Sequence, residues 1–110
     1  MSESIHIAEH INRSPAEVYA YVSNLDNLPT WAQGVTAEMN IRFAAPNDFG
    51  VLDHWAIVEG TTYYNPMRVV EHDDGSEIVF TLRNPTADDR AAIAADLATL
   101  KTILEATTAG

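Results

Sequence analysis

The sequence predicts an α+β domain in which a curved antiparallel sheet of about five strands wraps around one long C-terminal helix. Two patterns support this fold class. Residues 4–83 contain short segments of alternating apolar and polar side chains, bounded by turn residues, as is typical of strands with one wet face. Residues 86–109 instead repeat apolar side chains at helical spacing. A sheet and a helix that each have one apolar face are stabilised by packing together.

The C-terminal helix expected over residues 86–109 has a capped start and a continuous apolar face. Thr86 is the N-cap, and Asp89, three residues on, completes a variant of the capping box. The large apolar side chains of this helix share one face: Ile93, Leu97, Leu100, Ile103 and Leu104. Burial of these side chains is worth roughly 8–15 kcal/mol. We therefore expect the helix to lie against the sheet.

Composition indicates one small domain, residues 1–110, and narrows its partners. The chain has 110 residues, 46% of them hydrophobic, and no cysteine, which excludes disulfides and thiolate metal ligands. Its formal net charge of −10 disfavours binding to nucleic acid and to anionic membranes. No apolar run reaches the ~20 residues of a membrane span, and the first residues lack a signal-peptide pattern. We therefore expect a cytoplasmic protein.

The N-terminal part is expected to form a strand and then two short helices. The strand covers residues 4–12, where isoleucines alternate with other side chains. Ser14 caps the first helix, with Pro15 at its first position and Glu17 completing a capping box. A second, shorter helical turn begins at Asn24. Two short helices in succession turn the chain sharply.

The middle of the chain is expected to form an antiparallel meander. Its strands are predicted over residues 35–44, 49–58, 61–72 and 77–83. Glu59-Gly60 and Asp73-Asp74-Gly75 are hairpin turns between them. Pro66 cannot donate to a strand ladder, so it marks an edge or a bulge within the third of these strands.

Two motifs, Ser-Pro-Ala-Glu-Val-Tyr at 14–19 and Asn-Leu-Asp-Asn-Leu-Pro-Thr-Trp at 24–31, resemble the START-like (SRPBCC) superfamily. The segments 51–54, 66–70 and 79–82 are similar to a short bacterial branch of it. The superfamily includes polyketide cyclases/dehydrases, lipid-transport proteins and relatives of pollen allergens. The resemblance implies a helix-grip fold with an apolar cavity between the sheet and the C-terminal helix, where a hydrophobic small molecule binds. It implies no particular catalytic residue, because the superfamily has no universal ones.

The strand expected over residues 49–58 carries the best candidates for acid/base chemistry, His54 and Asp53. Adjacent strand residues point to opposite faces, so only one of the two can enter a cavity. His54 shares its face with the apolar Ala56 and Val58, which favours His54, and a histidine in an apolar pocket can act as a general base near neutral pH. If Trp55 points inward instead, Asp53 is the pocket residue. A purely structural, hydrogen-bonded histidine is the alternative.

The expected helix-grip fold also indicates which side chains line its cavity. The residues expected to line the cavity are Trp31, His54, Met67, Phe80, Leu97 and Leu100. Aromatic rings and methionine suit an adaptable apolar pocket. Simple packing in the core is the alternative for each of them.

One metal-binding motif is excluded by geometry. His6-Ile7-Ala8-Glu9-His10 matches the H-x-x-E-H pattern of some zinc peptidases, which requires a helix. Here the segment alternates as a strand, so the two histidines lie roughly 13 Å apart and cannot share one zinc ion. We expect no metal and no cofactor.

Three functions remain open. The first is binding of a small hydrophobic molecule. The second is a cyclase/dehydratase-like enzyme that uses His54 for proton transfer. The third is a protein–protein interaction module: relatives commonly have more strands than are expected here, and the missing strands leave a sheet edge that favours a homodimer.

Overall fold

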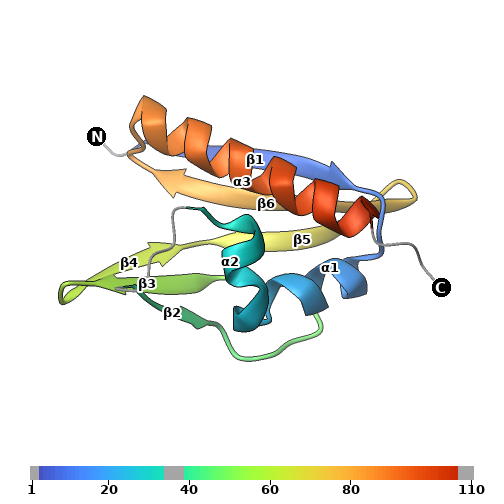
Figure 1. Cartoon of the computed structure of the whole chain (residues 1–110), viewed down its shortest axis with the longest axis horizontal. Helices are drawn as coiled ribbons and strands as arrows, with labels where there is room; N and C mark the ends of the chain where they lie inside the picture. The colour runs from blue at the N-terminus through green and yellow to red at the C-terminus, as the bar shows by residue number, and fades with distance from the viewer. Residues whose placement is uncertain (1–2, 34–38, 107–110) are drawn as a thin grey trace.

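The computed structural model describes residues 3–33 and 39–106 of the chain (Figure 1). The strands are β1 (Ser4–Ile11), β2 (Asn40–Phe43), β3 (His54–Val58), β4 (Thr61–Asn65), β5 (Met67–His72) and β6 (Gly75–Arg83). The helical elements are α1 (Pro15–Val22), η1 (Leu25–Asn27), α2 (Leu28–Trp31) and α3 (Ala87–Ala106). No helix among these described residues is long and apolar enough to cross a membrane. The predicted α+β class is confirmed; part of the strand predicted over 35–44 and the last residues of the predicted helix lie outside the described ranges.

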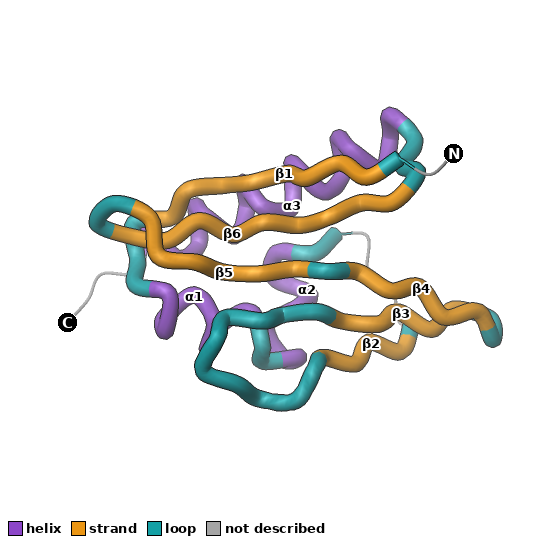
Figure 2. The backbone as a smooth tube through the Cα atoms, turned by 180° about the vertical axis from the view of Figure 1, so that it is seen from behind, coloured by secondary structure: helices purple, strands orange, loops and turns teal. Residues whose placement is uncertain are grey.

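The strands form two antiparallel sheets of three strands each, in the orders β1-β6-β5 and β2-β3-β4. The prediction of one sheet of about five strands is therefore wrong. The strand expected over 61–72 divides at Pro66, which has no N–H to donate. Figure 2 shows β4 and β5 following one another along a bent path. At the bend the N–H of Met67 donates to the Asp53 carboxylate (3.0 Å) instead of to a strand carbonyl.

The two sheets remain in contact along this bend, which we call the seam. The residues before β3 continue beside β5, where Leu52 N donates to the Met67 carbonyl (2.8 Å) and Val69 N donates to the Gly50 carbonyl (3.0 Å). The Pro66 carbonyl accepts a hydrogen bond from Thr81 N on β6 (3.0 Å). The strand predicted over 49–58 is accordingly shorter in the structure and begins at His54.

The helix α3 lies against the β1-β6-β5 sheet, packing mainly on β1 (Figure 1). On the face of α3 that contacts the sheet, the side chains of Leu97, Leu100 and Leu104 are buried. Those of Ile93 and Ile103 are only partly buried. Thr86 and Asp89 bond reciprocally: Asp89 N donates to the Thr86 hydroxyl (3.0 Å) and Thr86 N donates to the Asp89 carboxylate (2.9 Å). The predicted capping box is thus confirmed.

The helix α1 also begins as the sequence predicts. Ser14 is its N-cap, its hydroxyl accepts a hydrogen bond from Glu17 N (3.2 Å), and Pro15 is in the first turn. Val18 and Val22 are completely buried on the inward face of α1. The helix α2 follows η1 and buries Leu28 and Trp31. These short helices cover one end of the core. Trp31, on α2, lies at the edge of that core, near α3.

Candidate ligand-binding groove

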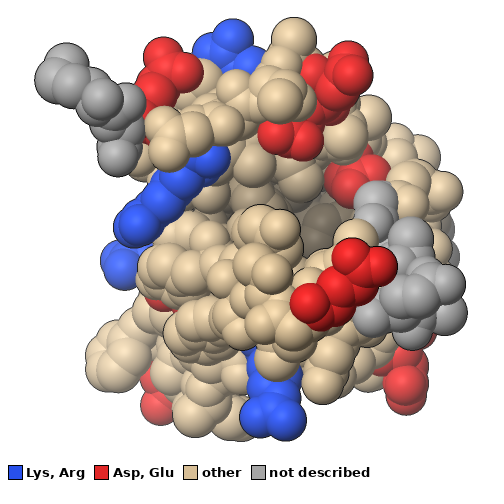
Figure 3. Space-filling model, turned by 90° about the vertical axis from the view of Figure 1, so that its left-hand side faces the viewer, with Lys and Arg blue, Asp and Glu red and all other residues tan. Residues whose placement is uncertain are grey.

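An open groove lies between the first half of α3 and the β2-β3-β4 sheet. Its volume is about 870 Å³. Figure 3 looks at this end of the molecule and shows the surface hollowed between an upper and a lower part, with acidic side chains at the upper margin. The apolar and aromatic side chains around it include Trp31, Ile41, His54, Ala56, Phe80, Ile93 and Leu97. The groove is therefore built from both sheets, α2 and α3.

The groove is open because the sheets diverge at the seam and α3 follows only one of them. The helix packs on β1 and α2, whereas the β2-β3-β4 sheet, which ends at Pro66, is directed away from it. Residues 87–95 of α3 are exposed except for Ile93, which is partly buried. The buried side chains of α3 begin at Asp96 and lie on the face of the helix that contacts the core.

His54 lies in the groove wall, where a hydrogen bond from one ring nitrogen and contacts with two aromatic rings hold its side chain in place. Its Nδ1 lies 3.1 Å from the Leu52 carbonyl oxygen, which can only accept, so Nδ1 carries the proton. The imidazole packs between Phe43 and Phe80, at ring-centroid distances of 5.3 and 5.6 Å. Burial lowers the pKa of His54 from its ordinary value of 6.5, although the Leu52 carbonyl and nearby Asp53 act in the opposite direction. Near neutral pH the ring is therefore uncharged, and its Nε2 is an acceptor.

Trp31 brings an indole from α2 to the inner end of the groove. The side chain is only 3% exposed, and its Nε1 is buried without a hydrogen-bond partner among the residues the structure describes. A buried N–H donor without an acceptor is uncommon because it forfeits the hydrogen bond it would make with water. Trp31 thus has a donor that is unused among the described residues and is buried behind the groove wall.

The structure brings together four of the six side chains predicted to line a cavity. Trp31, His54, Phe80 and Leu97 border the groove. Met67 and Leu100 do not; they are 1% and 0% exposed and belong to the closed core. Met67 follows Pro66 on β5, and Leu100 lies one turn beyond Leu97 toward the packed half of α3. Both residues therefore lie on the core side of the point where the two sheets diverge.

Asp53 lies outside the groove and has a structural role at the seam. Its carboxylate accepts hydrogen bonds from the Tyr64 hydroxyl (2.6 Å) and from Met67 N (3.0 Å). The bond to Asp53 raises the pKa of Tyr64. Because Ala56 and not Trp55 borders the groove, the alternative that placed Asp53 in the pocket is wrong.

Sequence reasoning missed the polar residues of the groove, among them Arg83, Asp89 and Asp96. Asp96 is only 6% exposed, and its carboxylate accepts a hydrogen bond from Gln33 N (3.2 Å) at the end of α2. A signal was available for Asp96, because it follows Ile93 by three residues and so interrupts the apolar face of the helix. No local pattern identifies Arg83, whose place in the groove depends on the folding of distant segments.

Comparison with solved structures identifies the fold. No model of a known protein family and no curated protein sequence matches this chain. A protein from Rhodobacter sphaeroides superimposes with a TM-score of 0.70 at 13% identity, covering 96% of this chain and 93% of its own. An AHSA1-like protein from Rhizobium etli has a TM-score of 0.67 at 16% identity, covering 100% of this chain and 86% of its own.

An enzyme structure shows the same likeness. Truncated norcoclaurine synthase from Thalictrum flavum has a TM-score of 0.67 at 16% identity and covers 97% of this chain and 96% of its own. AHSA1-like proteins and norcoclaurine synthase have folds of the helix-grip (SRPBCC) type. At these identities the likeness shows the fold alone, so the chain has a helix-grip-type fold, as its resemblance to START-like proteins predicts.

Proposed function

We propose that this protein binds a small hydrophobic molecule in the groove between the first half of α3 and β2-β3-β4. The observation that carries the proposal is the groove itself, about 870 Å³ in volume and bordered by Trp31, His54 and Phe80. Small-molecule sites in proteins are mostly apolar concavities of roughly 300–1,000 Å³ with a few polar groups that orient the ligand. The fold shared with norcoclaurine synthase agrees with a site between the sheet and the C-terminal helix.

Two polar atoms give such a ligand a preferred chemistry. The Trp31 Nε1 is a donor without a partner among the described residues, and the neutral His54 Nε2 is an acceptor. A molecule with a hydroxyl group on an apolar body would donate to His54 Nε2 and bury its remainder against Phe80 and Leu97. An acceptor on the molecule would reach Trp31 Nε1 only after the indole turns toward the groove, because this atom is buried. The groove margin contains Asp89 and Asp96 as well as Arg83, so an uncharged molecule fits better than an anion.

The two tryptophans allow a direct binding test. Trp31 borders the groove, whereas Trp55 is 36% exposed and stacks on Tyr64. In a Trp55→Phe variant, Trp31 becomes the single reporter. Titration with the neutral probe N-phenyl-1-naphthylamine is expected to quench Trp31 fluorescence saturably while the probe emission rises.

A matched pair of variants locates the bound probe. Ala56→Phe, on the same Trp55→Phe background, fills the groove from β3 and is expected to weaken probe binding at least about tenfold, the equivalent of 1.4 kcal/mol. Ile57→Phe adds an aromatic ring at the next residue, which does not border the groove, and should leave binding unchanged. Equal effects of the two substitutions, or no saturable quenching in the parent, would refute this function.

A second candidate, acid/base catalysis by His54, rests on the fixed ring geometry. The Leu52 carbonyl holds the proton on Nδ1, so Nε2 is free to accept one from a substrate. The expected activity is deuterium uptake next to the carbonyl of a simple ketone such as cyclohexanone, followed by NMR in deuterium oxide. His54→Ala and His54→Phe should both abolish exchange above background. His54→Phe retains a ring between Phe43 and Phe80, so its loss of activity is not a loss of packing. If exchange persists in both variants while stability falls in His54→Ala, His54 is structural.

A further inference from the structure

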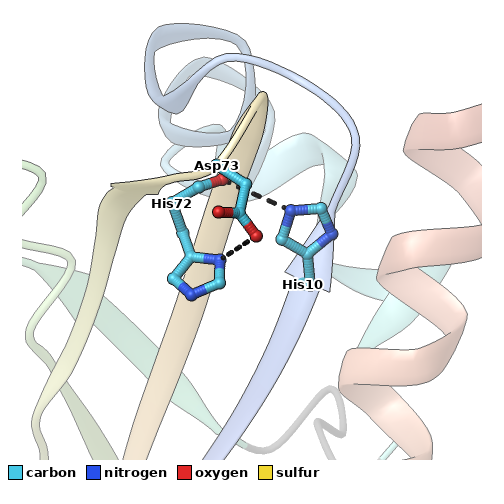
Figure 4. Close-up of side chains that lie close together, drawn as sticks. All are labelled: His10, His72 and Asp73. Carbon is cyan, nitrogen blue, oxygen red and sulfur yellow. Dashed lines mark hydrogen bonds and ion pairs between the residues drawn. The ribbon is translucent and has the colours of Figure 1, made fainter.

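A cluster of side chains lies away from the groove, at the opposite end of the β1-β6-β5 sheet. It consists of His10 near the end of β1, His72 at the end of β5 and Asp73 in the following turn (Figure 4). One ring nitrogen from each histidine and one carboxylate oxygen lie within 4.8 Å of one another. None of these residues borders the groove.

The sheet brings these residues together although His10 and His72 are 62 positions apart in the sequence. Both β1 and β5 pair with β6, so their ends meet at the β5–β6 turn. Gly75 permits this close approach, because a Cβ at that position would collide with the Ile11 carbonyl oxygen. Asp73 has a φ of 52°, a left-handed conformation that Asp tolerates better than most residues. The convergence is thus imposed by the backbone.

The contacts within the cluster are long. His10 Nε2 lies 3.4 Å from the His72 carbonyl oxygen, and His72 Nδ1 lies 3.4 Å from an Asp73 carboxylate oxygen. The two imidazole rings meet edge-on, with centroids 5.5 Å apart. These distances are beyond those of strong hydrogen bonds, so little bonding energy is lost if the three groups turn toward a common centre.

We propose that His10, His72 and Asp73 bind a divalent cation of the zinc class. Imidazole nitrogen and carboxylate oxygen are common ligands of zinc, at about 2.0–2.2 Å, with water able to complete a tetrahedron. Tetrahedral ligands at that distance lie about 3.3–3.6 Å apart, closer than the present 4.8 Å span. The His72 and Asp73 side chains are 49% and 80% exposed, so rotation about their side-chain bonds can close this difference without repacking the core.

The charge around the cluster favours a cation. The chain as a whole has a formal net charge of −10. The ammonium group of Lys101 donates to the His10 carbonyl oxygen (2.6 Å) and to the Glu105 carboxylate (2.8 Å). Glu105 therefore offsets its charge. Glu77 on β6 pairs directly with His10 across the ladder and adds a further negative charge.

A bound cation would join the end of β1 to the β5–β6 turn. His10 is 62 residues from His72 in the sequence, so the unfolded chain does not hold the three ligands together. The cation therefore binds the folded state preferentially and stabilises it. The sequence motif His6-Ile7-Ala8-Glu9-His10 therefore contributes one zinc ligand, His10, whose partners lie on another strand rather than four residues away.

The test uses the full chain without an affinity tag, freed of metal by chelation. Calorimetric titration with zinc chloride measures stoichiometry and affinity, and the melting temperature is recorded with and without zinc. The expected result is one zinc ion per chain and a higher melting temperature. His72→Ala and His10→Gln should each weaken binding at least about tenfold, since even outer-shell groups contribute about 10–100-fold to metal affinity; Asp73→Asn should weaken it by less.

Two matched controls separate this site from adventitious binding. His6→Ala removes a histidine on the same strand, one that bonds to Thr81 instead. Asp74→Asn removes a carboxylate from the same turn, outside the cluster. Both variants should bind zinc like the parent. The proposal would be overturned if no binding is detected at roughly 1 mM zinc, which corresponds to a binding free energy weaker than about 4 kcal/mol. Equal losses of zinc affinity in the His6 and His72 variants would also overturn it.

Discussion

The two halves of the molecule use the same helix differently. In the closed half, which comprises β1-β6-β5, α1 and residues 96–106 of α3, the helix packs tightly and Leu97, Leu100 and Leu104 are buried. In the open half, which comprises β2-β3-β4 and residues 87–95 of α3, the helix borders a groove and Ile93 alone is partly buried. The contrast shows that apolar side chains of one half are buried in the core, whereas those of the other half border an open groove.

The largest expected effect compares one side chain from each half. Leu100→Ala, in the closed half, should destabilise the protein by about 2–5 kcal/mol, because it leaves a cavity in a core where Leu100 is completely buried. Ile93→Ala, in the open half, should cost about 1 kcal/mol or less, because less surface is removed from contact. Urea unfolding measures both values. Similar costs at the two positions would contradict the division into a closed and an open half.

The next effect concerns the seam between the halves. Asp53→Ala removes the acceptor for Met67 N and for the Tyr64 hydroxyl, and should cost about 1–3 kcal/mol. Asp48→Ala, an acidic residue in the turn before β3, is the matched control and should change stability by less than about 0.5 kcal/mol. If chemical denaturation shows no difference between the two variants, the Asp53 carboxylate does not hold the sheets together.

A smaller effect is expected from the cap of α3. Thr86→Ala removes the hydroxyl that accepts from Asp89 N and should destabilise the helix by about 1 kcal/mol. The loss should be local, because residues 87–95 have few buried contacts to compensate for it. Hydrogen exchange followed by mass spectrometry should therefore speed up in 87–95 and remain unchanged in 96–106. Uniform acceleration along α3 would mean that the helix behaves as one unit.

The smallest effect is a pH dependence that arises from His54. Its pKa is lowered in the folded protein by burial, so the unfolded chain binds a proton more readily, and stability falls as the pH decreases below about 6.5. His54→Phe retains a ring between Phe43 and Phe80 but cannot titrate. The parent should lose more stability than this variant between about pH 7 and pH 5, as measured by melting temperature. Parallel pH profiles would show that burial of His54 has no energetic consequence.

The sequence predicted the features that depend on neighbouring residues. Both capping boxes, at Ser14 and Thr86, follow from local geometry and are confirmed. The same local alternation along β3 underlies the expectation for His54, which borders the groove in the structure. The Glu59-Gly60 turn is also confirmed, with φ angles of 49° and 81° at its two residues. In each case the physical cause, a cap or a turn conformation, acts within a few residues of the signal.

Features that depend on distant residues were not predicted. Pro66 was recognised as an interruption, but the pattern did not show that the strand would divide between two sheets. Likewise Met67 and Leu100 have the same apolar character as Phe80 and Leu97, and only the divergence of the sheets decides which of them reach the groove. The pairing of His10 with His72 also depends on the register of two ladders.

Pro66 has a consequence for how this protein can diversify. Because the chain passes from one sheet to the other at a residue that cannot join a ladder, the β2-β3-β4 hairpins form a unit whose length is independent of the leucine packing under α3. Insertions or deletions at the Glu59-Gly60 turn would lengthen or shorten the hairpin that borders the groove, while the buried leucines of α3 on the opposite sheet keep their contacts. The seam thus separates the leucine-packed half of the fold from the hairpins that border the groove.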